Sequence, residues 1–420
     1  METYKTSVLV VGGGPSGLAA AVSCSRLGIK TTLIERFGIV GGNLTLGHVA
    51  PIMGDVSHGT IVDEVINLLN LKWDVAHDIE KTKIALSNWL AKEKVDLFLQ
   101  TVAIGTIMEG NTIKGVIANN PSGNFQIDAD IIIDATGNGS VAAFAGADYE
   151  IGRTKDGLTQ PTTIMFTISN ISPLQKIECR HEEDDTILPE GSYLGLCRKA
   201  SLTGELPKNV NIVRLYRCEK PDERVVNATQ ANGVNGLDGQ QLAKAENILR
   251  QQEEMIFNFL KKHVPGFEDS QIKKSADTVG VRETRRIIGE YQLTDIDLMN
   301  GQRFNDVMVH KANFAIDIHN PSGPGQSESD GCPRHPKPYD IPYRCFVPKK
   351  IDNLFVTGRC ISGTHEAHAS YRVMRICMAM GQSIGTAAGL CLKEKQIPRT
   401  LDYRKVQEAL MAVGVDLFSE

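Results

Sequence analysis

Three glycines and one acidic residue have the types and spacing needed to hold the phosphates and a ribose of a dinucleotide. Gly12, Gly14 and Gly17 form a G-x-G-x-x-G turn after the apolar run 8–11, and Glu35 follows a second apolar run. The first glycine permits a tight turn, the second lets the backbone approach a pyrophosphate, and the third lets a helix pack on a strand. Glu35 can accept hydrogen bonds from both ribose hydroxyls, and its charge would repel a 2′-phosphate. The pattern predicts a dinucleotide-binding βαβ unit with the phosphates at the helix start.

Three histidines are candidates for proton transfer, because an imidazole titrates near neutral pH. His365 and His368 lie three residues apart in the C-terminal part of the chain, and His48 ends a second glycine-rich loop. For each histidine the alternative is a structural side chain held by hydrogen bonds. The pair His365-x-x-His368 also resembles a metal pair, but no third ligand can be identified, so we expect no metal site.

A block of charge at 282–286 is a further candidate for binding chemistry. It contains Arg282, Glu283, Arg285 and Arg286. One interpretation is a solvated face with local ion pairs, which contributes little to stability. The other is an anion clamp for a carboxylate substrate or for phosphates, with Glu283 orienting a guanidinium. Arg282 and Arg286 would share a face if the segment were helical, and we count Arg282 with the three histidines among the catalytic candidates.

The composition is that of a globular enzyme and excludes several classes of function. Of the 420 residues, 41% are hydrophobic and 23% are charged, and the net charge of −5 gives no footprint for nucleic acid. No apolar run approaches the ~20 residues that cross a bilayer, and we expect no secretory signal. The nine cysteines include no C-x-x-C pair, which excludes a redox dithiol, clustered iron–sulfur ligands and the usual zinc spacings. We expect a cytoplasmic protein with a small-molecule substrate and neither a nucleic-acid nor a membrane partner.

The elements that must position these residues follow an α/β pattern at both ends of the chain. The predicted elements there are helices at 18–27, 61–72, 82–92 and 372–395 and strands at 95–99, 103–108, 113–118, 131–134 and 353–357. The middle of the chain lacks this rhythm and contains predicted strands at 161–168 and 211–218 and a long helix over 242–260. The two ends are therefore expected to form one nucleotide-binding domain around an inserted second domain.

Four separated motifs together cover nearly the whole chain. They are the glycine turn with Glu35, the Ala-Thr-Gly turn at 135–137, the arginine block at 281–289 and the C-terminal block at 353–382. This set resembles the FAD-dependent oxidoreductase family of bacterial flavoproteins, related to the p-hydroxybenzoate hydroxylase and fumarate reductase branch. The resemblance implies bound FAD and an α/β fold (α+β overall), in which a Rossmann-like FAD-binding domain has three-layer ββα architecture. The implied domains are a split FAD-binding domain, 1–150 and 341–420, and an inserted mostly-β substrate domain, 151–340.

Matched by position, the resemblance implies a path for FAD along the chain. The glycine turn takes the pyrophosphate, Glu35 and Arg36 the adenosine ribose, and the loop 42–45 the ribityl chain or the flavin edge. The turn at 135–137 passes near the adenine half. The expected cofactor-binding residues are Gly12, Gly14, Pro15, Ser16, Gly17, Glu35, Arg36, Gly42, Asn43, Thr45, Ala135, Thr136, Gly137, Gly358, Arg359, Val373 and Met374.

Two further expectations concern the surroundings of the flavin. Arg359 stands where related folds have an aspartate, and its guanidinium could pair with phosphate oxygens. The helix beginning near Arg372 should point its positive end at the flavin N1/O2 locus. His310 and His319 flank a predicted strand at 313–317, which the resemblance places in the substrate domain with the end of the strand able to reach the pocket.

The function expected from these features is hydride transfer between a small polar metabolite and FAD, because a flavin supplies the redox chemistry and the protein positions the substrate. The alternatives are a flavin monooxygenase, a flavin-bearing electron-transfer subunit without its own substrate, and a plain NAD-binding dehydrogenase. The oligomeric state stays open, with a homo-oligomer as one possibility.

Overall fold

The computed structural model describes residues 2–72, 75–180, 184–323 and 334–419. Its main element is a seven-stranded sheet in the order β3-β2-β1-β6-β5-β4, with β17 also paired to β6. The strands of this sheet are β1 (Thr3–Val11), β2 (Thr31–Ile34), β3 (Asp96–Phe98), β4 (Val102–Glu109), β5 (Thr112–Asn120), β6 (Gly123–Asp134) and β17 (Leu354–Val356). β3, β2, β1, β6 and β17 run parallel, whereas β5 and β4 continue from β6 as antiparallel strands.

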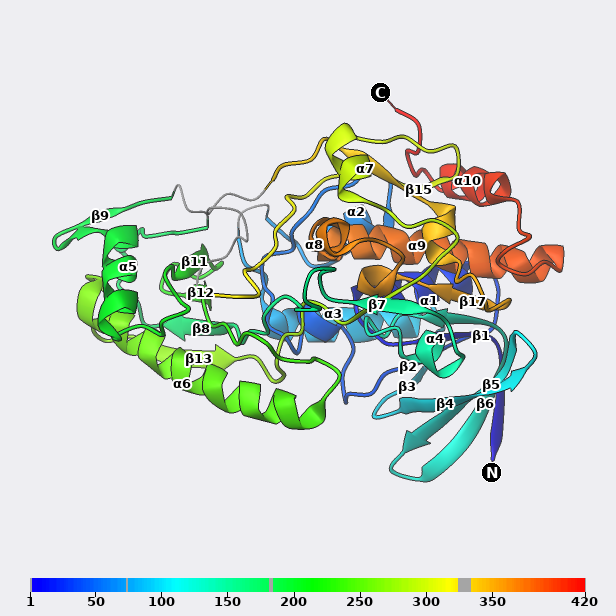
Figure 1. The fold of residues 1–420 in the computed structure, drawn as a ribbon, viewed down its shortest axis with the longest axis horizontal. Coiled ribbons are helices and arrows are strands. Elements are labelled where there is room, and N and C mark those ends of the chain that lie inside the picture. Colours follow the sequence, from blue (N-terminus) through cyan, green and yellow to red (C-terminus); the bar gives the residue numbers. More distant parts are fainter. Residues whose placement is uncertain (1, 73–74, 181–183, 324–333, 420) are drawn as a thin grey trace.

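Helices from opposite ends of the chain cover the parallel strands. α1 (Pro15–Arg26) and α9 (Met374–Glu394) lie side by side, and α9 also contacts β6 (Figure 1). The predicted ββα layering corresponds to the β4–β5 extension, the parallel strands and the α1–α9 pair. The α/β fold with a Rossmann-like unit is therefore confirmed. Other helices of this part are α2 (Ile61–Leu68), α3 (Ile79–Lys92), α4 (Ser140–Phe144), α8 (His365–Tyr371) and α10 (Tyr403–Ala412).

A row of glycines on α9 makes the contact with α1 unusually close. A Cβ added at Gly381 would lie 2.0 Å from the backbone oxygen of Ser16, and one at Gly385 would lie 2.2 Å from that of Ala20. Contacts this short leave no room for a side chain, so the two helix backbones touch directly. The spacing of four residues places both glycines on one face of α9. The glycine row therefore fixes the C-terminal helix against the start of the nucleotide-binding unit.

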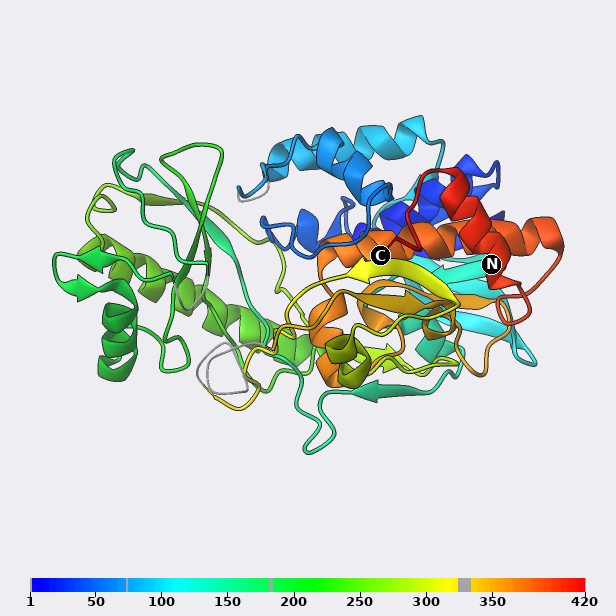
Figure 2. The same cartoon turned by 90° about the horizontal axis from the view of Figure 1, so that it is seen from above.

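The middle of the chain forms a smaller lobe, which we define as the described residues of 164–279; the larger lobe is the rest. The smaller lobe contains a four-stranded antiparallel sheet in the order β11-β12-β8-β13. Its elements are β8 (Phe166–Ser169), β9 (Ile187–Leu188), β10 (Gly191–Ser192), α5 (Tyr193–Thr203), β11 (Arg214–Arg217), β12 (Arg224–Asn227), α6 (Gly239–His263) and β13 (Gln271–Ser275). Figures 1 and 2 show the long α6 running along this lobe, beside the larger one. The expected mostly-β character thus describes the sheet but not the two helices packed with it.

The buried apolar side chains form separate clusters in the two lobes. The largest cluster draws on residues between 8 and 147 and between 287 and 417. Two others lie within 164–276 of the smaller lobe. A small cluster that includes Ala50, Ile79, Met165 and Tyr216 joins the lobes. Residues 287–318 thus pack with the nucleotide-binding core, although the expected inserted domain includes them; the domain boundaries stay a prediction.

Two sequence-based strand boundaries were wrong. The strand expected at 313–317 is β15 (Val307–Ala312), which pairs with β16 (Tyr339–Pro342). The residues after it form only isolated bridges, because the backbone of Asn313 pairs with Asp55 instead. The strand expected at 161–168 begins at Phe166, and the residues before it again form isolated bridges.

The other elements of the larger lobe are short. They are β7 (Tyr149–Ile151), β14 (Arg285–Ile287) and α7 (Asp295–Asn300), with 3-10 turns at Gly42–Leu44, Tyr343–Phe346 and Gly358–Cys360. β7 and β14 pair antiparallel. Among the described residues, no helix is long and apolar enough to span a membrane.

Candidate functional site

The glycine turn between β1 and α1 has the close contacts that its motif predicts. Gly12 has a φ of +105°, and a Cβ there would lie 2.6 Å from the carbonyl oxygen of Ala135. A Cβ at Gly17 would lie 1.8 Å from the carbonyl oxygen of Gly12. Only glycine fits at either position, since one needs a left-handed backbone and both adjoin backbone atoms.

Gly14 differs from the other two glycines because the space beside it is open. A Cβ at Gly14 would meet nothing within 4 Å. Gly14 is also the N-cap of α1, which has no side-chain cap and carries a proline in its first turn. Free N–H groups at a helix start, next to open space, suit an anion such as a pyrophosphate. The turn therefore fits the phosphates of a dinucleotide.

Glu35 is buried at the end of β2, beside this turn. One carboxylate oxygen accepts a hydrogen bond from Gly13 N at 2.6 Å and the other accepts one from Phe37 N at 3.0 Å. Burial raises the pKa of Glu35, and these hydrogen bonds partly oppose that effect. A carboxylate has about four acceptor positions, so both oxygens can still accept from ribose hydroxyls. The guanidinium of the exposed Arg36 lies 4.5 Å from the Phe37 ring centroid.

The loop after Glu35 folds back onto the glycine turn. Gly41 N donates to the carbonyl oxygen of Gly13 at 2.7 Å, and a Cβ at Gly42 would lie 3.2 Å from the Cα of Gly14. The fully buried hydroxyl of Thr45 donates to the carbonyl oxygen of Val40 at 2.7 Å. Thr45 therefore shapes this loop through a hydrogen bond of its own.

Asn43 stabilises the same loop through its backbone. Its carbonyl oxygen accepts a hydrogen bond from Val49 N at 3.0 Å. The contacts of Asn43, Gly42 and Thr45 with a cofactor stay predictions, and of the three Gly42 lies directly against Gly14.

The C-terminal block meets the glycine turn at Ser16. The hydroxyls of Ser16 and Thr357 are 2.8 Å apart and buried. A Cβ at Gly358, whose φ is +79°, would lie 3.1 Å from the Cβ of Ser16. Segments from the two ends of the sequence thus meet beside the glycine turn.

Arg359 fastens the turn at 135–137 to the C-terminal block. Its guanidinium donates to the carbonyl oxygens of Gly137 and Val281 and to the side-chain oxygen of Asn138. These contacts involve three of its five N–H groups and no carboxylate. Burial lowers the pKa of Arg359 to about 10. A phosphate contact, as expected from the sequence, is compatible with the two remaining N–H groups.

Asp134 is a structural residue that the sequence reasoning did not single out. Its buried carboxylate accepts hydrogen bonds from the backbone and hydroxyl of Thr136 and from Ala142 N. The Asp134 carboxylate at the end of β6 therefore stabilises the turn that starts at Ala135. An aspartate ending an apolar strand was the available signal.

The start of α9, like that of α1, has no side-chain cap. Its N-cap, Val373, makes no side-chain capping bond, and the first turn contains no acidic residue. Val373 and Met374 are both 8% exposed. The helix expected at 372–395 is α9, which begins two residues later than expected because Val373 has extended backbone between α8 and α9.

The candidate histidines do not form one group. His365 and His368 are both buried on α8, and the Nδ1 of His365 lies 2.9 Å from an oxygen of Glu283. Burial, followed by the charges of nearby arginines, lowers the pKa of His368 well below its usual value. His48 lies elsewhere, with its Nε2 3.5 Å from Asp277. Burial lowers its pKa as well.

The arginine block is a loop followed by a strand, so Arg282 and Arg286 do not share a helical face. β14 begins at Arg285 because the backbone there pairs with β7. The guanidinium of Arg286 donates to Glu283 and to the backbone oxygens of Gly152 and Gly363. Arg286 and Glu283 thus form a buried structural ion pair. The neighbouring Arg282 turns toward the smaller lobe instead.

A group of charged residues lies where the two lobes meet. Arg282 donates to the carbonyl oxygen of Pro161 at 2.7 Å, and Arg372 lies 3.3 Å from Asp317. Asp317 in turn lies 3.2 Å from His319. The expectation that the end of the 313–317 segment reaches a substrate pocket stays a prediction.

Two further members of this group, Arg214 and Gln160, were missed by the sequence reasoning. Arg214 lies on β11, and its positive charge helps to lower the pKa of both Asp317 and Arg282. Gln160 carries its side-chain oxygen 3.4 Å from Arg372. An arginine within an apolar strand was the only signal that the sequence offered.

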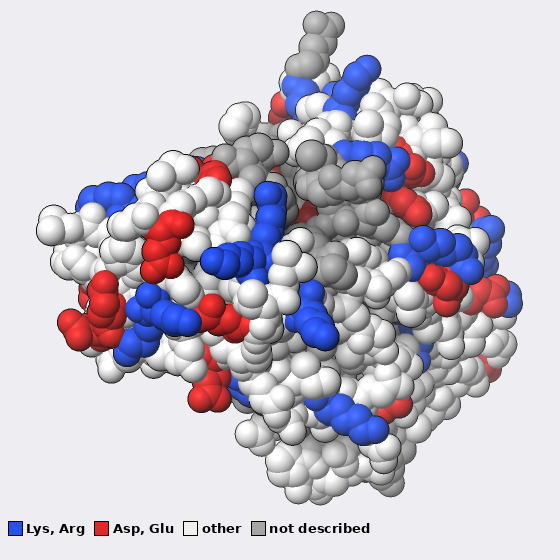
Figure 3. Space-filling model, turned by 60° about the vertical axis from the view of Figure 1, so that its left-hand side comes forward, with Lys and Arg blue, Asp and Glu red and all other residues white. Residues whose placement is uncertain are grey.

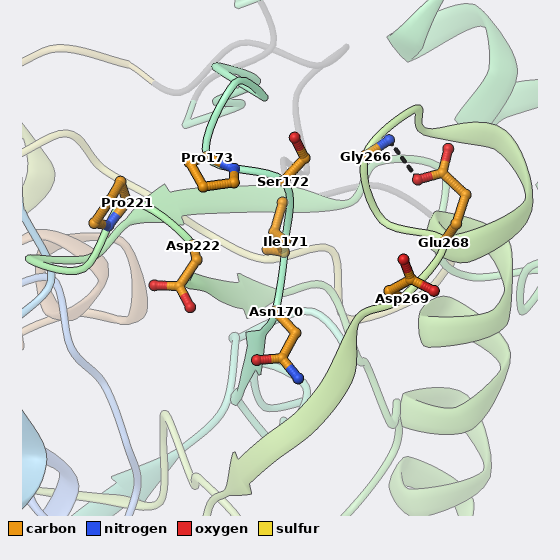
Figure 4. A pocket seen from close by; sticks show the side chains of 9 residues that line it. All are labelled: Asn170, Ile171, Ser172, Pro173, Pro221, Asp222, Gly266, Glu268 and Asp269. Atoms are coloured by element: carbon orange, nitrogen blue, oxygen red, sulfur yellow. Dashed lines mark hydrogen bonds between the residues drawn. The ribbon is translucent and has the colours of Figure 1, made fainter.

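A surface pocket of about 400 Å³ lies away from this junction. It is lined by loop residues at one end of the smaller lobe, including Asp222, Glu268 and Asp269 (Figure 4). The carboxylate of Glu268 accepts a hydrogen bond from Gly266 N at 2.8 Å and thus closes its own turn. We assign no chemistry to this pocket.

Two broader features of the site concern metals and surface charge. No group of three or more His, Cys, Asp or Glu side chains suited to a metal ion occurs in the described part of the chain. Figure 3 shows basic and acidic side chains interspersed over one face of the molecule.

Comparisons with known proteins agree with this geometry. Dihydrolipoyl dehydrogenase of Buchnera aphidicola is 33% identical over 147 residues, which are 32% of this chain and 30% of that protein. Leghemoglobin reductase of Vigna unguiculata is 27% identical over 237 residues, covering 46% of this chain and 45% of that protein. The chain thus spans less than half the length of these curated relatives.

A solved structure shares the fold over almost the whole chain. The p-nitrophenol 4-monooxygenase of Pseudomonas putida aligns with a TM-score of 0.51 at 10% identity and covers 98% of this chain and 84% of that one. Residues 7–410 match the family described as FAD dependent oxidoreductase. This match includes the glycine turn, the arginine block and the C-terminal block, so the chain belongs to the family of FAD-dependent oxidoreductases and FAD is its cofactor.

Proposed function

We propose that this protein binds FAD along the β1–α1 turn and transfers a hydride between a small polar metabolite and the flavin. The observation that carries the proposal is the open space at Gly14, next to a helix start without a side-chain cap. Glu35 and the Ser16–Thr357 contact surround that space from both ends of the chain. FAD, when bound, supplies the hydride acceptor or donor.

The chain's own residues would hold the cofactor and substrate in place. The N–H groups at the start of α1 would bind the pyrophosphate, and Glu35 would bind the adenosine ribose. The positive end of α9, near Val373 and Met374, would stabilise negative charge on the flavin ring. These roles follow from the family and from the geometry around Gly14.

Among the histidines, His365 is the best candidate for a proton acceptor. Glu283 holds its Nδ1, which fixes the ring, and its Nε2 has no hydrogen-bond partner among the described residues. His368 stays neutral because its pKa is lowered, and it packs edge-on against Tyr371. We therefore propose that His365 takes the proton when the metabolite is oxidised.

We also propose the split domain arrangement and a cytoplasmic location. The separate apolar clusters of the two lobes support the former. The eight cysteines of the described chain are all free, which suits a reducing compartment.

The test is to purify the protein, record its visible spectrum and identify the chromophore released by heat. A metabolite screen without oxygen should then reveal a compound that bleaches the flavin. A preparation that is folded, mixed with excess FAD and still colourless would contradict the proposal. Rapid reoxidation by oxygen with a hydroxylated product would instead indicate a monooxygenase, and bleaching only by a protein partner would indicate an electron-transfer subunit.

A further inference from the structure

The junction between the lobes carries an excess of positive charge. Arg282 and Arg372 come from separate segments; Arg372 lies 3.3 Å from Asp317, whose charge also acts on Arg282. His319 adds no charge at neutral pH, because burial and the charge of Arg282 lower its pKa to about 4. Among the described residues, these two guanidinium groups thus share one carboxylate.

Glu283 does not balance this excess. Its carboxylate is fully buried and already pairs with Arg286 and with His365. The same carboxylate also accepts a hydrogen bond from Gln160 N at 3.0 Å. Burying a charge without a partner is costly, so the junction favours an additional anion.

Unused hydrogen-bond donors point into the same place. The Nε2 of Gln160 and the Nε of Arg372 are buried, and neither makes a hydrogen bond to another described residue. Gln160 is only 1% exposed, and its amide oxygen faces Arg372 at 3.4 Å. Buried donors are normally satisfied. Here an acceptor supplied by a ligand would satisfy both.

Solvent reaches part of the group. The side chains of Arg372 and Asp317 are 15% and 17% exposed, in contrast to the sealed Glu283 at 0%. Arg372 directly precedes the N-cap of α9, the helix start that we propose lies at the flavin. A small solute at this junction would therefore lie close to the expected position of the flavin ring.

We propose that Arg282, Arg372 and the amide of Gln160 bind a carboxylate group of the substrate. This inference rests on the proposed function and adds the chemical class of the metabolite. A guanidinium matches the two oxygens of a carboxylate with two parallel N–H groups. Phosphate groups of FAD share that chemistry, and they are the source that the test must separate.

The experiment uses the purified holoenzyme in a buffer without carboxylates. Acetate, succinate and benzoate are titrated in parallel with acetamide, succinamide and benzamide. Binding is read from the change in the flavin absorption spectrum and from the midpoint of thermal unfolding. The acids are expected to bind at least about tenfold more tightly than the matching amides, since only they engage the guanidinium charge.

Variants then assign the binding to the arginines. Arg282→Gln and Arg372→Gln should each weaken acid binding about tenfold or more, and Arg282→Lys should weaken it less. The control is Arg217→Gln, because Arg217 lies on β11 near Arg214 but is 50% exposed and pairs with Glu178. Its effect should stay within about twofold.

The outcomes separate this inference from the proposed function. A wild-type protein without FAD defeats the proposed function, and the unfolding midpoint still reports acid binding. Amides that bind as well as acids, with FAD retained, defeat only the carboxylate site. Release of FAD by Arg282→Gln, with acid binding unchanged, would assign the cluster to the cofactor phosphates and overturn the inference. If a Gln variant does not fold, the comparison of acids with amides on the wild type decides the question.

Discussion

Gly14 and Gly17 belong to one motif, yet the structure predicts opposite effects for the same substitution. At Gly14 the added methyl meets nothing within 4 Å, and the φ of −73° is accessible to any residue. At Gly17 it would lie 1.8 Å from a backbone oxygen of Gly12, in a helix that cannot shift away from the sheet. Gly14→Ala should therefore keep the fold, whereas Gly17→Ala should damage it.

The magnitudes follow from these contacts. Gly14→Ala replaces an N-cap glycine by a poorer cap, and the gain in backbone order offsets part of that loss, so the free energy of unfolding should change by about 1 kcal/mol or less. Gly17→Ala forces an overpacked contact with backbone and should cost about 3 kcal/mol or more. The methyl at Gly14 would occupy the space where the pyrophosphate approaches, so FAD affinity should fall about tenfold or more, which is about 1.4 kcal/mol.

The assay measures urea unfolding of the apoproteins and titrates each with FAD. The reasoning is refuted if Gly14→Ala binds FAD as tightly as the wild type, because the open space would then not be the phosphate site. It is equally refuted if the Gly17→Ala apoprotein is as stable as the wild type.

Three further predictions concern stability. Gly385→Ala should lower the free energy of unfolding by about 2 kcal/mol or more, since its Cβ would lie 2.2 Å from the backbone oxygen of Ala20; urea unfolding measures it, and no change would contradict the close helix contact. Glu35→Gln should lower the free energy of unfolding by about 1–3 kcal/mol, as thermal unfolding would show. An amide offers one acceptor oxygen where the carboxylate offers two, so either Gly13 N or Phe37 N would lose its acceptor. His319→Gln should remove part of the acid sensitivity of folding between pH 6.5 and 4, as urea unfolding across that range would show.

The sign of the pH effect follows from the lowered pKa of His319. Folding keeps the ring neutral down to about pH 4, whereas the unfolded chain takes up the proton near pH 6.5, so stability falls as the pH falls through this window. The full effect is about 3 kcal/mol. Asp317, the carboxylate facing His319, has a lowered pKa despite its burial, so its contribution is lost only below pH 3.8. Equal pH dependence of wild type and His319→Gln would contradict this account.

The nucleotide-binding part of the fold was predictable because its signals are local. The turn that contains Gly12 and Gly17 is specified by glycines at fixed spacing, by the apolar strands beside it and by Glu35 after β2. The family resemblance added the C-terminal block, and Ser16 and Thr357 show the contact between the two ends. Local spacing and long motifs thus specified which segments meet.

The junction between the lobes was only partly predictable, because it depends on contacts far apart in sequence. Arg214 lies in a strand whose pattern indicates burial, and nothing nearby in sequence reveals the partners that it meets. Arg282 and Arg286 would share a face only in a helix, and the pairing of β14 with β7 makes the segment a strand from Arg285 onward. The direction of these side chains depends on strand pairing between distant segments, which cannot be read from a single sequence.

The glycine row of α9 has a consequence for how the chain is made. α1 leaves the ribosome long before α9 is synthesised. Until then, the alanine-rich face of α1 that α9 covers in the folded protein stays exposed. The nascent chain therefore exposes apolar surface during most of its synthesis, a state in which chaperones are expected to bind. A protein released before residue 374 would keep that face uncovered and be prone to aggregate.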